Sequence, residues 1–109
     1  MALLKEIVQL DPRIRMAVST GNLFGKVEKA TRDDLDSIDI EDDWSFLKII
    51  ATSMVTMFEK YEGKFGILSM SGACMDKLNF FFQKDDNIIL VSYDPCPITK
   101  IYSKLIGII

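Results

Sequence analysis

The architecture of this chain follows most directly from residues 42–62, DDWSFLKIIATSMVTMFEKYE. Drawn as a helix with about 100° between successive residues, this stretch has two adjoining apolar faces. The first face holds Trp44, Leu47, Ala51, Met54, Val55, Phe58 and Tyr61, and the second holds Phe46, Ile49, Ile50 and Met57. Together they span on the order of 240°, whereas a surface helix needs an apolar stripe of about 100°. A single sheet cannot cover so wide a face, so we expect a second contact surface on this helix.

Outward from this helix, the spacing of apolar residues alternates between the helical period and the period of two that strands show. The expected ranges are helix 2–10, strands 13–19 and 23–30, helix 42–62, strands 65–71, 77–83 and 88–93, and helix 98–109. A tight turn at Gly21-Asn22 is predicted to join the first two strands. We therefore predict one α/β (α+β) domain over residues 1–109, with a five-stranded antiparallel sheet and the long helix across one face.

Three local arrangements follow from these patterns. Ile14, Met16 and Val18 are expected on one buried face of the first strand, because alternate residues of a strand share a face. Phe81 is expected on the opposite face from its two phenylalanine neighbours, where a flanking helix would cover it. Gly63 is predicted to end the long helix in the left-handed conformation.

The composition is globular, and it lacks the residue most used in acid–base catalysis. The chain has 13 basic and 16 acidic residues, a net charge of -3, and no histidine. Histidine is the usual general acid or base near neutral pH and the commonest metal ligand. Net acidity argues against a general nucleic-acid binder. The chain shows neither an apolar run of about 18 residues nor a signal-peptide pattern, so we expect a cytoplasmic protein with no membrane contact.

Acidic residues are concentrated in the 33–43 segment, which contains seven of them and no basic residue. We interpret this segment as a solvated connection whose carboxylates favour the positive end of the helix that follows. An acidic loop that binds a partner is the alternative interpretation.

The residue sets that common enzymes need are missing. A Ser-His-Asp or Cys-His arrangement cannot be built without histidine, and no phosphate-binding glycine motif occurs. The two cysteines, Cys74 and Cys96, are too few for a zinc site, and the six methionines are typical of core or interface filling. We therefore expect no enzymatic activity, no metal and no cofactor.

This order of elements, at this length, resembles the roadblock/dynein-light-chain domain, a small profilin-like fold. Residues 10–15 (LDPRIR), Gly63-Lys64 and residues 89–92 (ILVS) are similar to a group of uncharacterised small archaeal proteins of that type. The resemblance implies the sheet order 2-1-5-4-3. It also implies a dimer in which the third strand and the long helix of two subunits meet.

Carried onto this chain, the resemblance implies a non-catalytic, homodimeric interaction or regulatory module. Its partner would be a second copy of the chain together with a small GTPase or another protein. The implied dimer interface consists of Phe46, Ile49, Ile50, Ser53, Met57, Phe65, Ile67 and Ser69. The wide apolar helix, found without the resemblance, favours the same surface.

A small-molecule sensor is the competing hypothesis, because profilin-like sheets can hold a ligand between the sheet and its helices. Such a site needs a pocket with converging polar groups. The polar residues expected to face inward are few: Ser53, Ser69 and Asn79.

The implied strand order also bears on the two cysteines. Cys74 follows the third strand and Cys96 the fifth, with the fourth strand between them. Two strand spacings amount to roughly 9.5 Å, beyond the ~7 Å between Cα atoms that a disulfide spans. Both thiols are therefore predicted to be free.

Overall fold

The structure is a computed structural model that describes residues 2–20, 26–84 and 87–108 of the chain. The helices are α1 (Ala2–Gln9), α2 (Ser37–Glu59), α3 (Glu62–Phe65) and α4 (Ile98–Ile108), and the strands are β1 (Ile14–Thr20), β2 (Val27–Thr31), β3 (Met70–Cys74), β4 (Asn79–Lys84) and β5 (Ile88–Tyr93). The strands form one antiparallel sheet in the order β2-β1-β5-β4-β3. The predicted fold class and strand order are confirmed, and α3 is an addition to the predicted elements.

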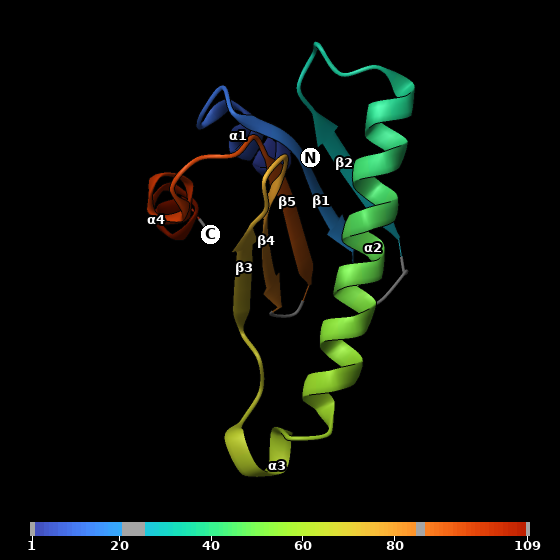
Figure 1. Cartoon of the computed structure of the whole chain (residues 1–109), viewed down its shortest axis with the longest axis vertical. Coiled ribbons are helices and arrows are strands. Elements are labelled where there is room, and N and C mark those ends of the chain that lie inside the picture. The colour runs from blue at the N-terminus through green and yellow to red at the C-terminus, as the bar shows by residue number, and fades with distance from the viewer. Residues whose placement is uncertain (1, 21–25, 85–86, 109) are drawn as a thin grey trace.

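Helices cover both faces of the sheet (Figure 1). Helix α2 lies across one face, and α1 and α4 lie on the other, so the chain has a separate apolar core on each side. Phe80 and Phe82 of β4 pack in the core beneath α2, while Phe81 packs in the core beneath α1 and α4. The ring of Phe81 meets that of Tyr102 edge-on, with 5.7 Å between centroids. The prediction that a flanking helix covers Phe81 is confirmed.

The first strand departs from the alternation that its sequence predicts. Met16 and Val18 pack beneath α2, but Ile14 packs in the core on the opposite face. The register between β1 and β5 shifts between Ile14 and Met16, and an extra residue in a strand turns the side chains before it to the other face. The expectation that all three residues share one face was therefore wrong for Ile14.

Part of the first hairpin lies outside the described residues, including the predicted Gly21-Asn22 turn and the start of the predicted strand 23–30. The part of that strand that the structure describes, β2, ends at Thr31, one residue later than predicted.

Helix α2 begins at Ser37, five residues before the predicted start. Asp36 precedes it in an extended conformation, and its side chain accepts a hydrogen bond of 2.8 Å from the backbone N–H of Asp39. A capping carboxylate of this kind satisfies one of the free N–H groups of the first turn. The acidic segment is therefore largely helical rather than a solvated loop.

The region after α2 differs most from the prediction. Helix α2 ends at Glu59, and the short helix α3 follows, with Gly63 inside it rather than at a left-handed cap. The positive φ occurs at Gly66 instead, at 88°. Residues 66–69 then run without strand pairing, so the third strand occupies Met70–Cys74 and not the predicted 65–71.

Candidate functional site

The C-terminal turns of α2 extend beyond the sheet. A helix of 23 residues is roughly 34 Å long, whereas strands of five to seven residues span about 17–23 Å. Figure 1 shows α2 running past the end of the sheet, with α3 at the far tip. We call the part formed by residues 56–69 the overhang. An apolar side chain of the overhang can be buried against the sheet only where a strand lies next to it.

The burial of the sheet-facing side of α2 decreases toward its C-terminal end. Leu47 and Ala51 are fully buried against the sheet, and Val55 is nearly so. Phe58 and Tyr61 continue the same face, but 37% of Phe58 and 53% of Tyr61 remain exposed. The sequence places both on the sheet-covering face, and they are exposed because the sheet ends before they are reached.

The eight residues predicted for the dimer interface divide into two groups. Phe46 and Ile50 are half-buried and pack against the core beneath α2, where the Phe46 ring meets Phe80 edge-on at 5.9 Å. The other six are exposed: Ile49, Ser53, Met57, Phe65, Ile67 and Ser69. Residues 65, 67 and 69 belong to α3 and the connection after it, not to the strand that pairs with β4.

Large apolar side chains dominate the exposed group. Phe65 is 74% exposed, Ile67 69% and Ile49 63%, and Met57 is more than half exposed. Phe58, Tyr61, Phe65 and Gly66 line a crevice at the elbow between α2 and α3, and its walls are almost wholly apolar. Tyr61 and Phe65 face one another there, with 6.2 Å between ring centroids. Apolar surface of this extent on one side of a small domain is typical of a contact site.

One edge of the sheet adjoins this surface. β3 is the last strand of the sheet and pairs with β4 on its inner side only. The pairing begins next to the overhang, where the backbone N–H of Lys84 donates a 2.7 Å hydrogen bond to the carbonyl of Ser69. An edge strand offers unpaired backbone groups to which another strand can add.

The opposite end of the molecule is held by a charged cluster that sequence analysis missed. Asp43 of α2 is only 6% exposed. Its carboxylate accepts bonds from Arg15 Nε and Nη2 at 2.8 and 3.2 Å, and from the Ser92 hydroxyl at 2.9 Å. Asp94 extends the cluster by accepting from Arg15 at 3.4 Å and from Arg32 at 2.7 Å. We call these five residues the charged clamp.

The charged clamp joins α2 to β1 and β5 and to the residue that follows β2. The hydrogen bonds that Arg15 donates to Asp43 raise the pKa of Arg15, against the opposing effect of burial. The sequence shows both residues, but they are separated by 28 positions and nothing local links them. The expectation that the acidic 33–43 segment is simply solvated is therefore wrong for Asp43.

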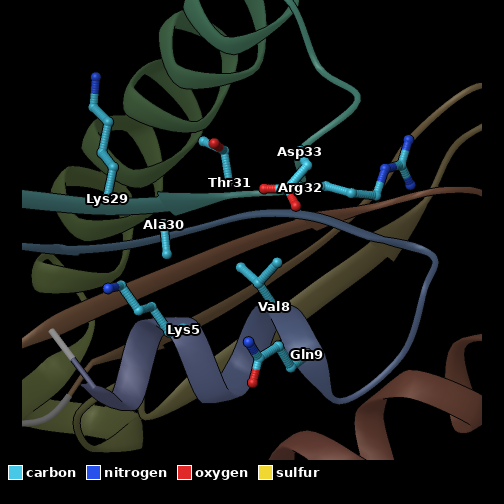
Figure 2. A pocket seen from close by; sticks show the side chains of 8 residues that line it. All are labelled: Lys5, Val8, Gln9, Lys29, Ala30, Thr31, Arg32 and Asp33. Carbon is cyan, nitrogen blue, oxygen red and sulfur yellow. The ribbon is translucent and has the colours of Figure 1, made fainter.

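A groove of about 380 Å³ lies between α1 and β2. Figure 2 shows that its polar side chains do not converge: Lys29 and Thr31 point to the α2 side of β2, whereas Lys5 and Gln9 lie on α1 at the other side. The Lys29 Nζ atom lies over the Trp44 ring, 5.0 Å from its centroid. Arg32 is engaged by Asp94 and Asp34. The groove therefore lacks the converging groups of a small-molecule site.

The three polar residues considered for a ligand pocket are also not brought together. Ser53 and Ser69 are exposed. Asn79 is fully buried, but its side chain already donates to the carbonyl of Cys96 at 2.8 Å and accepts from the N–H of Met75 at 3.3 Å. The expectation that these residues face inward is confirmed for Asn79 and wrong for Ser53 and Ser69.

Within the ranges that the structure describes, no group of three or more His, Cys, Asp or Glu side chains is placed to hold a metal ion. Likewise, no helix in these ranges is long and apolar enough to cross a membrane.

Comparison with known proteins identifies the fold of the chain. No family model and no curated protein sequence matches the chain. Among solved structures, a roadblock/LC7 domain from Streptomyces avermitilis aligns with a TM-score of 0.67 and 14% identity, over 98% of this chain and 88% of that one. MglC from Myxococcus xanthus aligns with a TM-score of 0.58 and 13% identity, over 97% of this chain and 89% of that one. The chain therefore has a roadblock-like fold.

Proposed function

We propose that this roadblock-like chain is a non-catalytic, cytoplasmic interaction module that works as a homodimer. In this proposal the dimer presents a composite surface that scaffolds or regulates a protein partner, for which a small GTPase is the first candidate. The observation that carries the proposal is the overhang, where a 23-residue helix and the segment after it leave a row of large apolar side chains uncovered.

A second copy of the chain is the occupant that best fits this surface. The exposed residues of α2 (Ile49, Ser53 and Met57) lie at four-residue spacing, which is one stripe of a helix and suits packing against an identical stripe. Strand β3 is an edge of the sheet and follows the overhang directly in the chain. In the proposed dimer, one two-fold axis brings together the two helices and the two sheet edges. The pairing strand is then Met70–Cys74, and residues 65–69 flank it.

Size-exclusion chromatography with light scattering tests the dimer directly. The unmodified chain should have the mass of two copies, and Met57→Asp should have the mass of one, because a carboxylate buried in an apolar contact costs several kcal/mol. Met57 is suited to this test because its half-exposed side chain is not part of the protomer core. Ile50 is less suitable, since it packs against that core.

Thr56→Asp is the matched control, because it places the same charge one position away on the exposed, polar side of the helix. It should remain dimeric. If Met57→Asp is folded by circular dichroism and still dimeric, the overhang is not the interface and the proposal fails.

The partner is tested separately once the dimer is established. Small GTPases from the same organism, loaded with GDP or with a GTP analogue, would be titrated against the dimer and against Met57→Asp. Binding that depends on the nucleotide and is lost with the dimer supports a regulatory module. A thermal-shift screen with metabolites and nucleotides addresses the sensor hypothesis, and a reproducible shift by one compound would favour that hypothesis instead.

A further inference from the structure

The side chain of Cys74 reaches the backbone of Cys96. The Sγ atom of Cys74 lies 3.8 Å from the carbonyl oxygen of Cys96. Two covalent bonds join that oxygen to the Cys96 Cα, so the sulfur is within about 6.6 Å of that Cα. The Asn79 side chain of β4 also donates to this carbonyl, so the loop after β5 lies against the start of β4. Both cysteines are free thiols in the structure, as predicted.

The backbone holds both cysteines in place. Cys74 is the last residue of β3 and pairs with Asn79 of β4, which pairs in turn with Tyr93 of β5. Asn79 is fully buried, and its side chain fixes the Cys96 carbonyl through the 2.8 Å hydrogen bond. Cys96 itself stands between Pro95 and Pro97, which restrict its backbone to extended conformations.

The buried phenol of Tyr93 lies in the core against which Cys96 packs, and burial raises the pKa of Tyr93 to about 12. Tyr93 is 1% exposed and pairs with Asn79, which pairs in turn with Cys74.

The two thiols differ in their exposure to solvent. Cys74 is exposed, whereas Cys96 is half-buried and packs against the core. A reagent in solution can reach the first directly. The Cys96 thiol can then react with the mixed disulfide that forms on Cys74.

We propose that Cys74 and Cys96 form a reversible intramolecular disulfide that ties the end of edge strand β3 to the loop before α4. The co-reactant is a low-molecular-weight disulfide of the glutathione type. The inference rests on the contacts of these two residues and does not depend on the proposed function.

The chemistry is thiol–disulfide exchange in two steps. The Cys74 thiolate attacks one sulfur of the reagent, whose S–S bond breaks, and one glutathione thiolate leaves. The Cys96 thiolate then attacks the Cys74 sulfur, forming the internal bond and releasing the second glutathione thiolate. The two protein thiols lose two electrons and two protons, and the reagent gains them as two free thiols.

Intact-mass spectrometry under non-reducing conditions tests this on the full chain after incubation with glutathione disulfide. The unmodified protein should become lighter by two hydrogen atoms, resist alkylation, and return to its starting mass with dithiothreitol. Cys96→Ser should instead keep one bound glutathione, because its mixed disulfide has no thiol to resolve it. The bridged form should unfold at a temperature higher by roughly 10 °C, since a cross-link restricts the unfolded chain.

The double variant Ser71→Cys with Cys74→Ser is the matched control. It keeps two cysteines but moves one to the other face of β3, since Ser71 pairs with Phe82, which packs beneath α2. It should form no internal bridge. The proposal is overturned if the unmodified chain retains glutathione as Cys96→Ser does, if it cross-links only between chains, or if the displaced cysteine bridges equally well.

Discussion

The two ends of helix α2 differ in their contacts: the first is bound to the sheet by charged groups, and the second carries exposed apolar side chains. Near its start, the buried carboxylate of Asp43 joins the helix to the sheet through Arg15 and Ser92. Beyond its last buried residue, Val55, the helix continues into the overhang, where Met57 and Phe65 are exposed. The polar groups at the first end have their hydrogen-bond partners within one chain, whereas the second end leaves apolar surface that another molecule can cover.

This difference shows how one helix can serve both the fold and an interface. The charged clamp sets the position of α2 on the sheet, because two hydrogen bonds from one guanidinium to one carboxylate define an orientation as well as a distance. The overhang is then displayed at a definite angle. An interface on a rigid element loses less conformational entropy on binding than one on a mobile loop.

The largest expected effect lies in the half of α2 that packs on the sheet. Leu47→Ala should lower the free energy of unfolding by about 3 to 4 kcal/mol, because it leaves a cavity at a fully buried position. Urea denaturation followed by circular dichroism measures this. A loss below about 1 kcal/mol would mean that α2 is not packed as described.

Removing the clamp should have the next largest effect. Asp43→Ala leaves the buried Ser92 hydroxyl and the Arg15 guanidinium without their main partner, and should cost about 2 to 3 kcal/mol. Asp42→Ala is the control, since Asp42 is exposed and its removal should change little. Equal losses in the two variants would show that the clamp does not hold α2.

Acid should weaken the contact between the start of β1 and α4, because Asp11 accepts a hydrogen bond from Lys104. Burial opposes ionisation of this carboxylate, but hydrogen bonds from Lys104 and from the Arg13 N–H outweigh it and hold its pKa below the ordinary value of 3.8. The ionised group therefore stabilises the fold above pH 3.8, and this contribution is lost as the pH falls through the folded-state pKa.

Asp11→Asn removes this acid-dependent contribution. The variant should be about 1 kcal/mol less stable than the unmodified chain at neutral pH, with a smaller difference in acid. Urea denaturation across the acid range measures both curves. Curves that stay parallel down to low pH would contradict the assignment of Asp11.

The smallest effect on the protomer is expected in the overhang. Met57→Ala should change the free energy of unfolding by less than about 0.5 kcal/mol when measured on monomeric chains, because the side chain is already more than half exposed. The same variant should weaken self-association, which a dilution series by analytical ultracentrifugation measures. A large loss of protomer stability with unchanged association would show that Met57 serves the protomer core and not an interface.

The order of elements could be predicted because each has a local signal. Alternation across residues 80–82 places Phe81 on the other side of β4 from its neighbours, and the structure confirms it. The early start of α2 also had a signal, since Asp36 lies three residues before Asp39 in the spacing of an N-terminal cap.

Other features depend on contacts that no local pattern shows. The strand 70–74, MSGAC, has weak strand propensity and forms because β4 pairs with it, whereas the more apolar 65–69 segment stays outside the sheet. The shift between Ile14 and Met16 exists only relative to β5. The candidate interface could be predicted as a surplus of apolar surface, but its extension to Phe58 and Tyr61 follows from where the sheet ends.

The core beneath α1 and α4 has a consequence for how the protein is made. Leu4 and Ile7 from the first helix share this core with Ile101 and Leu105 from the last. During translation, the sheet and α2 can assemble while the other face still lacks half of its cover. That side can close only after α4 has left the ribosome, so until then the apolar face that α4 covers is exposed to chaperones and to aggregation.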